Sequence, residues 1–378
     1  GNLIITGSFK EDFSFAGKEV FGEGVKNAYI LKYDATNTPK WGASLAGSAE
    51  IKGIATDAEG NIYVGGTFAG KVEFLSSSAD GEPAISKEGL KIDGEFGSEQ
   101  SSTFIAKYDK GGKIVEVTSF VPESLPELVA TGMYSPTAQD LYFTISDIKV
   151  AGGKVYATAS FTGQTTIGNG TFDGAYSNLF DFMYFDVPNI GVFSVDCATL
   201  GTAEIVAKME LTGPFADTTP SLSSPVVTVK DGQVIAGFIM STSEATNAVN
   251  VEIGSYKTSL TPTVGVVDYV IVKDGTVSSI KKATSESLIS YDSLKDLVIN
   301  GNDVYMVGSF DTAAPAAEAA AATVAPVGKS DIFVAKFGAA DLSVGQIYAN
   351  GIDEGENGSE KVSSTALVDG ALYINTIG

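Results

Sequence analysis

The side chains that the sequence lacks limit its chemistry more strongly than those it contains. All 24 basic residues are lysine, and histidine is absent. Without histidine there is no imidazole base or histidine metal ligand, and without arginine there is no planar fork for phosphate. Cys197 is the single cysteine, which excludes an internal disulfide and a cysteine-rich metal site. Because neither histidine nor arginine can lower its pKa, we expect Cys197 to be structural and expect the chain not to be an enzyme.

Carboxylates are the abundant reactive groups. The 46 acidic residues give a formal net charge of −22, which disfavours nucleic acid as a partner. Recurrent turns such as Asp57–Gly60 and Asp109–Gly112 are predicted to be closed by the aspartate, with glycine supplying a positive φ, and calcium ligation by their oxygens is the alternative. The segment Ile352–Glu360 is the strongest calcium candidate of the chain, although a solvated acidic loop is the favoured interpretation. Its candidate ligands are Asp353, Glu354, Glu356 and Glu360.

Aromatic residues are concentrated in one connection, between Phe172 and Val187. If they are exposed, they form a platform for a glycan or protein partner; otherwise they pack back on the neighbouring strands. The candidate binding residues are Phe172, Tyr176, Phe180, Phe182, Tyr184 and Phe185.

A strand pattern that occurs about five times along the chain must position these residues. A Gly- or Asp-rich turn leads into a strand that ends in a small residue and Phe, and a second strand follows after a variable connection. The first strands are predicted at Asn2–Phe9, Asn61–Phe68, Lys154–Phe161, Gln233–Met240 and Asp303–Phe310. The second strands are predicted at Ala28–Asp34, Thr103–Asp109, Gly191–Asp196, Val264–Lys273 and Asp331–Phe337. With one further strand on each side, such as Ile51–Asp57 and Lys113–Phe120, the repeating unit has four strands, A to D.

Long-period repetition of four-stranded antiparallel units predicts an all-β fold, a β-propeller, in preference to a linear β-solenoid. Five blades are detected, and six are possible if the chain is truncated. We expect one domain over residues 1–378, with repeats at about 1–50, 51–140, 141–220, 221–293 and 294–360 and closing strands at 361–378. The B-to-C connections vary most between repeats, so we expect function there.

The repeat resembles the SBBP-type β-propeller repeat of secreted bacterial proteins. The resemblance covers nearly the whole chain and is strongest in repeats one, two and five. It rests on Ala55, Asp57, Gly60, Asn61, Tyr63, Val64, Gly66, Phe68, Phe104, Ile105, Ala106, Lys107, Tyr108, Asp109 and Gly112, and in the first repeat on Lys32, Tyr33, Asp34 and Trp41. It implies a propeller fold and an extracytoplasmic location, and it supplies no catalytic residues.

Together these observations predict a non-enzymatic, extracytoplasmic bacterial β-propeller whose loops bind a protein or glycan at the cell envelope. The alternative is a carboxylate-dependent, glycan-active enzyme with its site at the axial mouth of the propeller. No apolar run reaches the length of a membrane span, and no cofactor is expected other than Ca²⁺ at the acidic loop.

Overall fold

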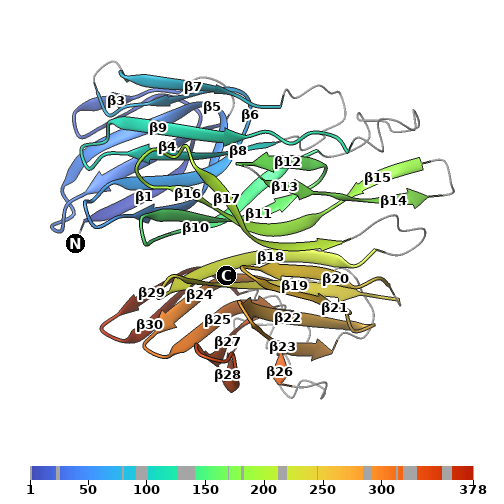
Figure 1. The fold of residues 1–378 in the computed structure, drawn as a ribbon. Helices are drawn as coiled ribbons and strands as arrows, with labels where there is room; N and C mark the ends of the chain where they lie inside the picture. The colour runs from blue at the N-terminus through green and yellow to red at the C-terminus, as the bar shows by residue number, and fades with distance from the viewer. Residues whose placement is uncertain are drawn as a thin grey trace. The chain divides into compact units, whose positions relative to one another are not determined.

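The computed structural model describes residues 2–22, 26–78, 81–90, 101–125, 141–168, 170–179, 183–211, 219–244, 246–283, 292–311, 314–317, 330–350 and 360–377. Within these ranges the regular structure consists of thirty β-strands and no helix, and the registered strand pairs are antiparallel (Figure 1). The predicted all-β class is therefore confirmed.

The chain divides into two compact units. Unit 1 comprises Gly1–Gly174, Tyr184–Asp186 and Phe193–Ile205, and unit 2 comprises Ala175–Met183, Val187–Val192 and Val206–Gly378. The expectation of a single domain over residues 1–378 stays a prediction.

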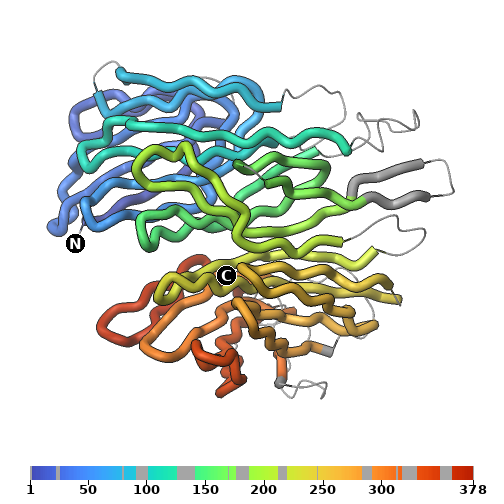
Figure 2. Tube along the Cα trace, in the orientation of Figure 1, coloured from blue at the N-terminus to red at the C-terminus, as the bar shows by residue number. Residues whose placement is uncertain are grey.

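Strands follow one another along the chain through tight turns and longer connections (Figure 2). The first half of the chain contains β1 (Leu3–Phe9), β2 (Phe13–Phe15), β3 (Lys18–Val20), β4 (Asn27–Tyr33), β5 (Pro39–Thr56), β6 (Ile62–Leu75), β7 (Ala84–Glu88), β8 (Ser102–Tyr108), β9 (Ile114–Phe120), β10 (Phe143–Ala151), β11 (Lys154–Phe161), β12 (Gln164–Ile167), β13 (Gly170–Asp173), β14 (Ala175–Leu179) and β15 (Met183–Val187). The second half contains β16 (Asn189–Asp196), β17 (Ala203–Leu211), β18 (Ser221–Lys230), β19 (Gln233–Thr242), β20 (Val249–Ile253), β21 (Tyr256–Leu260), β22 (Val266–Lys273), β23 (Thr276–Ala283), β24 (Ser293–Asn300), β25 (Asp303–Phe310), β26 (Ala316–Ala317), β27 (Asp331–Gly338), β28 (Val344–Asn350), β29 (Lys361–Val368) and β30 (Ala371–Ile377).

Apart from β6, the first and second strands of the repeats lie within a few residues of their predicted bounds. In unit 2 the sheet orders are β18-β19-β22-β23-β26 and β24-β25-β27-β28, so each first strand pairs with the second strand of its own repeat. In unit 1 one sheet runs β1-β4-β5-β6-β8-β9, with β7 paired to β6. Here β5 and β6 are longer than predicted, because each continues without a break into the next part of the sheet.

Side-chain alternation along these strands produces the hydrophobic cores. In unit 1, one cluster centres on Phe68, Phe74 and Phe104, and a second centres on Phe143, Phe161 and Phe193. The cluster of unit 2 includes Tyr269 and Phe333, whose rings meet edge to face at 4.9 Å. Ring pairs of this geometry add to the hydrophobic stabilisation from buried area alone.

Two short elements of unit 1 position the candidate site. The β2–β3 hairpin pairs Phe13 with Val20, and its tight turn places Ala16 and Gly17 at positive φ. Strand β7 pairs with the end of β6, so that Glu73 lies opposite Ser86. Both elements belong to B-to-C connections, the part of the repeat in which function is expected.

Candidate functional site

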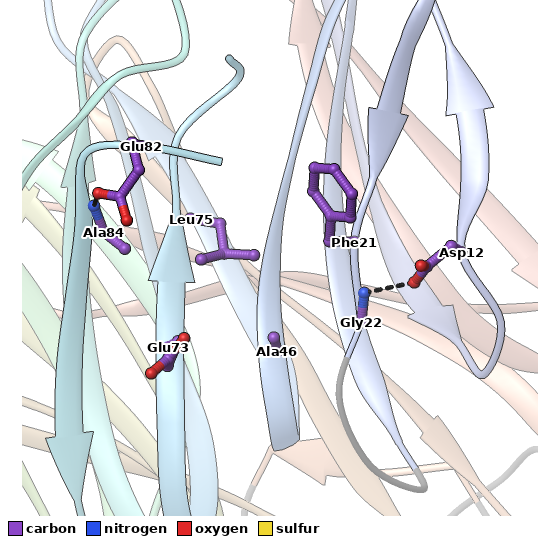
Figure 3. Close-up of a pocket in the computed structure, with 8 residues that line it drawn as sticks. All are labelled: Asp12, Phe21, Gly22, Ala46, Glu73, Leu75, Glu82 and Ala84. Carbon is purple, nitrogen blue, oxygen red and sulfur yellow. Dashed lines mark hydrogen bonds between the residues drawn. The ribbon is translucent and has the colours of Figure 1, made fainter. Parts of the chain in front are cut away.

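A pocket of about 310 Å³ opens in unit 1 beside these two elements. Its lining combines apolar side chains with three carboxylates, and none of the eight lining residues is basic (Figure 3). The apolar residues are Phe21, Ala46, Leu75 and Ala84, the carboxylates are Asp12, Glu73 and Glu82, and Gly22 completes the lining. The volume lies at the lower end of the range for small-molecule sites.

Glu73 is held in place by its strand neighbours. It lies on β6 opposite Ala46 of β5, and its Oε1 accepts hydrogen bonds from Lys71 Nζ at 2.5 Å and from Ser86 Oγ at 3.3 Å. The bond from Lys71 is the main cause that lowers the pKa of Glu73 below its usual value. Glu73 is therefore ionised at neutral pH, and its side chain remains 29% exposed.

The other two carboxylates are anchored by the backbone of the connections that carry them. Asp12 Oδ1 accepts a bond from the N–H of Gly22 at 2.7 Å, which joins the two ends of the β2–β3 hairpin (Figure 3). Glu82 Oε2 accepts a bond from the N–H of Ala84, the first residue of β7, at 2.9 Å. Because one oxygen of each group is fixed by the backbone, the carboxylates are oriented before any ligand arrives.

This combination suits a ligand that has a cationic group and an apolar part. Carboxylates form their strongest hydrogen bonds with charged donors such as an ammonium group. Phe21 and Leu75 supply apolar surface beside them. An alkyl ammonium group, as in a lysine side chain, presents both features in one chain.

The aromatic connection that the sequence singled out is described only in part. Phe172 is fully buried on β13, and its ring lies 4.9 Å from that of Phe161 and 6.0 Å from that of Phe143. Phe172 thus belongs to the core of unit 1 and is not part of an exposed platform. The side chains of Tyr176, Tyr184 and Phe185, and all of Phe180 and Phe182, lie outside the described residues.

The acidic loop is also mostly outside the described residues, which include neither Asp353, Glu354 nor Glu356. Glu360 is described and is 3% exposed; its backbone pairs with Ser330 through bonds of 3.0 Å in both directions. Among the described residues no group of three or more acidic or cysteine side chains is arranged to hold a metal ion. Calcium binding at Asp353, Glu354, Glu356 and Glu360 stays a prediction.

The Asp-Gly turns have the predicted structural role. Asp109 Oδ1 accepts bonds from the N–H groups of Gly111 and Lys113, and Gly112 has a φ of +87°. Cys197 is likewise a structural residue: its carbonyl oxygen accepts bonds from Lys107 Nζ at 2.7 Å and Tyr63 Oη at 3.1 Å. Burial raises the pKa of the Cys197 thiol, so its nucleophilic thiolate is disfavoured.

No protein-family model matches the sequence, and no curated protein does. Among solved structures, the chain is similar to the quinohemoprotein alcohol dehydrogenase from Comamonas testosteroni, with 10% identity and a TM-score of 0.32, over 98% of this chain and 72% of that one. It is also similar to a mutant of an apocarotenoid oxygenase from Synechocystis, with 12% identity and a TM-score of 0.33, over 86% of this chain and 56% of that one.

These two solved structures correct one expectation. The absence of histidine, arginine and a catalytic motif led to the prediction that the chain is not an enzyme, whereas both similar structures are enzymes. As an exclusion of catalysis the prediction is wrong. The low TM-scores and identities assign neither activity to this chain.

Sequence reasoning missed the pocket because its lining residues are spread from position 12 to position 84. No motif joins them. The available signal was their place in the repeat, since Asp12, Phe21, Glu82 and Ala84 all lie in B-to-C connections. Separately, no helix in the described part of the chain is long and apolar enough to cross a membrane.

Proposed function

We propose that this chain is a binding protein whose B-to-C connections capture a partner protein through a lysine side chain or a free amino terminus. The proposal rests on the unit 1 pocket, in which three carboxylates lie beside apolar surface and no basic residue is part of the lining; one of the three, Glu73, also pairs with Lys71 outside the lining. The net charge of −22 attracts a basic partner over long range.

We further propose that the strands form a β-propeller and that the protein is bacterial and extracytoplasmic. The four-stranded order β24-β25-β27-β28 and the recurrence of the same strand pair along the chain support the propeller. The resemblance of the repeat to the SBBP-type repeat of secreted bacterial proteins supports the extracytoplasmic location. In this arrangement the strands form a rigid frame, and the connections between them carry the binding residues.

Calorimetric titration with the tripeptide Gly-Lys-Gly tests the binding proposal, because its Nε-acetylated form keeps the same backbone and alkyl chain but has no side-chain charge. For this comparison both peptides carry a blocked amino terminus. We expect the unmodified peptide to bind and the acetylated peptide to bind at least tenfold more weakly. Equal binding of the two peptides, or binding of neither, contradicts the proposal.

Variants locate the site. The double variant Glu73→Gln and Glu82→Gln removes two charges from the pocket while keeping side-chain size, and we expect about a tenfold loss of affinity. Glu59→Gln is the matched control, since Glu59 is exposed in a turn of the same unit and is not a lining residue. A neutral chitin oligosaccharide, titrated in parallel, identifies a glycan ligand instead if it binds and the peptide does not.

A further inference from the structure

Three charged side chains meet inside unit 2. Lys282, on β23, has a fully buried side chain, and its Nζ contacts Oδ2 of Asp292 and lies 2.7 Å from Oδ1 of Asp311. Asp292 directly precedes β24 and Asp311 directly follows β25; their side chains are 2% and 13% exposed. Two different sheets of unit 2 thus place one amine between two carboxyl groups.

The surroundings are apolar. Tyr269, which is 0% exposed on β22, lies beside this cluster and packs on Phe333. Burial, followed by the charge of Asp292, raises the pKa of the Tyr269 hydroxyl well above its usual value. Burying an ammonium and a carboxylate together costs several kcal/mol per ion before their attraction offsets it. Joining them in a neutral amide removes both charges from this environment.

The geometry around Asp292 is that of an acyl-transfer site. The two oxygens of its carboxyl group have different partners: Oδ2 meets the amine of Lys282, and Oδ1 accepts the backbone N–H of Asp311 at 3.1 Å. A backbone donor in this place stabilises the negative charge that develops on Oδ1 when a nucleophile attacks the carbonyl carbon. The Asp311 carboxylate is within hydrogen-bond distance of the attacking nitrogen and can act as its base.

We propose that Lys282 and Asp292 form an intramolecular amide bond, with Asp311 as the catalytic residue. Asp311 takes a proton from the Lys282 ammonium, and the freed lone pair of Nζ attacks Cγ of Asp292. A C–N bond forms and the bond from Cγ to Oδ2 breaks. That oxygen leaves as water, with the proton that Asp311 had taken and a second proton from Nζ, so that Asp311 is again a carboxylate and the amide nitrogen keeps the third proton. One ammonium and one carboxylate become one amide and one water, so charge and atoms balance without an oxidant or co-reactant. Because the fold holds the reacting groups next to one another, the step is intramolecular and its activation barrier is lowered.

The first test is the intact mass of the purified full chain, measured after denaturation. We expect it to be lower than the sequence mass by one water molecule. The full sequence mass overturns the proposal.

Tryptic digestion locates the bond. Trypsin cleaves after a free lysine, so an unmodified chain yields the peptide 283–295, cut after Lys282 and Lys295. The linked chain instead yields the uncut peptide 282–295, lighter by one water, because the modified lysine is no longer a cleavage site. Recovery of 283–295 as the main product also overturns the proposal.

Matched variants exclude other losses of water, such as ring closure at an Asp-Gly sequence. Lys282→Arg keeps the charge but has no reactive amine, so it should have its full sequence mass; retained water loss would overturn the proposal. Lys281→Arg, at the adjacent lysine that pairs with buried Asp268, should remain linked. Asp311→Asn should have its full mass, and a linked Asp311→Asn chain refutes the role of Asp311 as base. The wild-type digest decides the central point even if a variant does not fold.

Discussion

At the scale of single residues, aspartates at or shortly after the ends of second strands close the turns there. In each, a carboxylate oxygen accepts the N–H of the residue two positions later, which closes a local ring and satisfies a turn donor. The set is Asp34, Asp109, Asp196 and Asp341. Asp34 has the most partners, since it also accepts from the N–H of Thr38 and pairs with Lys40 at 2.7 Å. The contact with Lys40 is the main cause that lowers the pKa of Asp34 well below its usual value.

This lowered pKa predicts a loss of stability in acid. The folded state holds the Asp34 carboxylate ionised, whereas an unfolded aspartate titrates near its ordinary value of 3.8. The contribution of Asp34 is therefore fully present above that pH and is lost as the pH falls below it. In thermal unfolding between about pH 6 and pH 2.5, Asp34→Asn should show a smaller acid-induced fall in Tm than the wild type. Asp231→Asn, in an exposed turn, is the control, and equal falls in wild type and Asp34→Asn would contradict the assignment.

At the scale of elements, a shift in strand register recurs where strand B, the first strand of a repeat, pairs with strand A, which precedes it in the sequence. The register shifts between Ile51 and Gly53, between Ile145 and Ile148, and between Leu294 and Asp296, each time within strand A. The facing strand B carries a small residue there: Gly66, Ala159 and Gly308, each two positions before the terminal Phe. Such bulges bend and twist a strand at a fixed place. They explain why a small residue lies two positions before the terminal Phe of the first strand.

Gly66→Ala tests this explanation. A Cβ at Gly66 would lie 2.0 Å from the carbonyl oxygen of Glu50, which is backbone and cannot move aside without breaking the sheet. We expect a loss of about 2–3 kcal/mol in the free energy of unfolding, measured with urea. Gly201→Ala is the matched control: its new Cβ has no neighbour nearer than 3.4 Å and its φ is not positive. An unchanged stability of Gly66→Ala refutes the steric role of the glycine.

The period-two alternation of apolar residues and the Gly and Asp turns were sufficient to predict most strands, because both signals are local. Prediction failed where structure depends on distant parts of the chain. Polar residues within β5 and β6 predict a break in each strand. In the structure, the pairing between the two strands continues through these residues to Phe74. The cluster of Lys282 and Asp311 could not be predicted either, because residues 29 positions apart become neighbours only where the sheet that contains β23 packs on the sheet that contains β24 and β25.

At the scale of the whole molecule, the surplus of acidic residues is the dominant physical property. With 46 acidic and 24 basic residues, even complete pairing leaves 22 negative charges on the folded chain. The described ion pairs on the surface, such as Lys26 with Glu50 and Lys71 with Glu73, are substantially exposed and contribute little. Mutual repulsion within a compact state therefore opposes folding at low ionic strength.

Salt should consequently stabilise this protein at neutral pH. Raising NaCl from about 0.01 M to about 0.15 M shortens the Debye length from about 30 Å to about 8 Å, which screens repulsion between separated carboxylates. At pH 7 we expect the Tm to rise by several degrees, measured by far-ultraviolet circular dichroism. The same titration near the isoelectric pH of 4.3 is the control, since the net charge is then close to zero and only the general effect of the salt remains. A rise of the same size at both pH values would show that charge repulsion does not limit stability, and the cause would then be the preferential exclusion of salt from the protein surface.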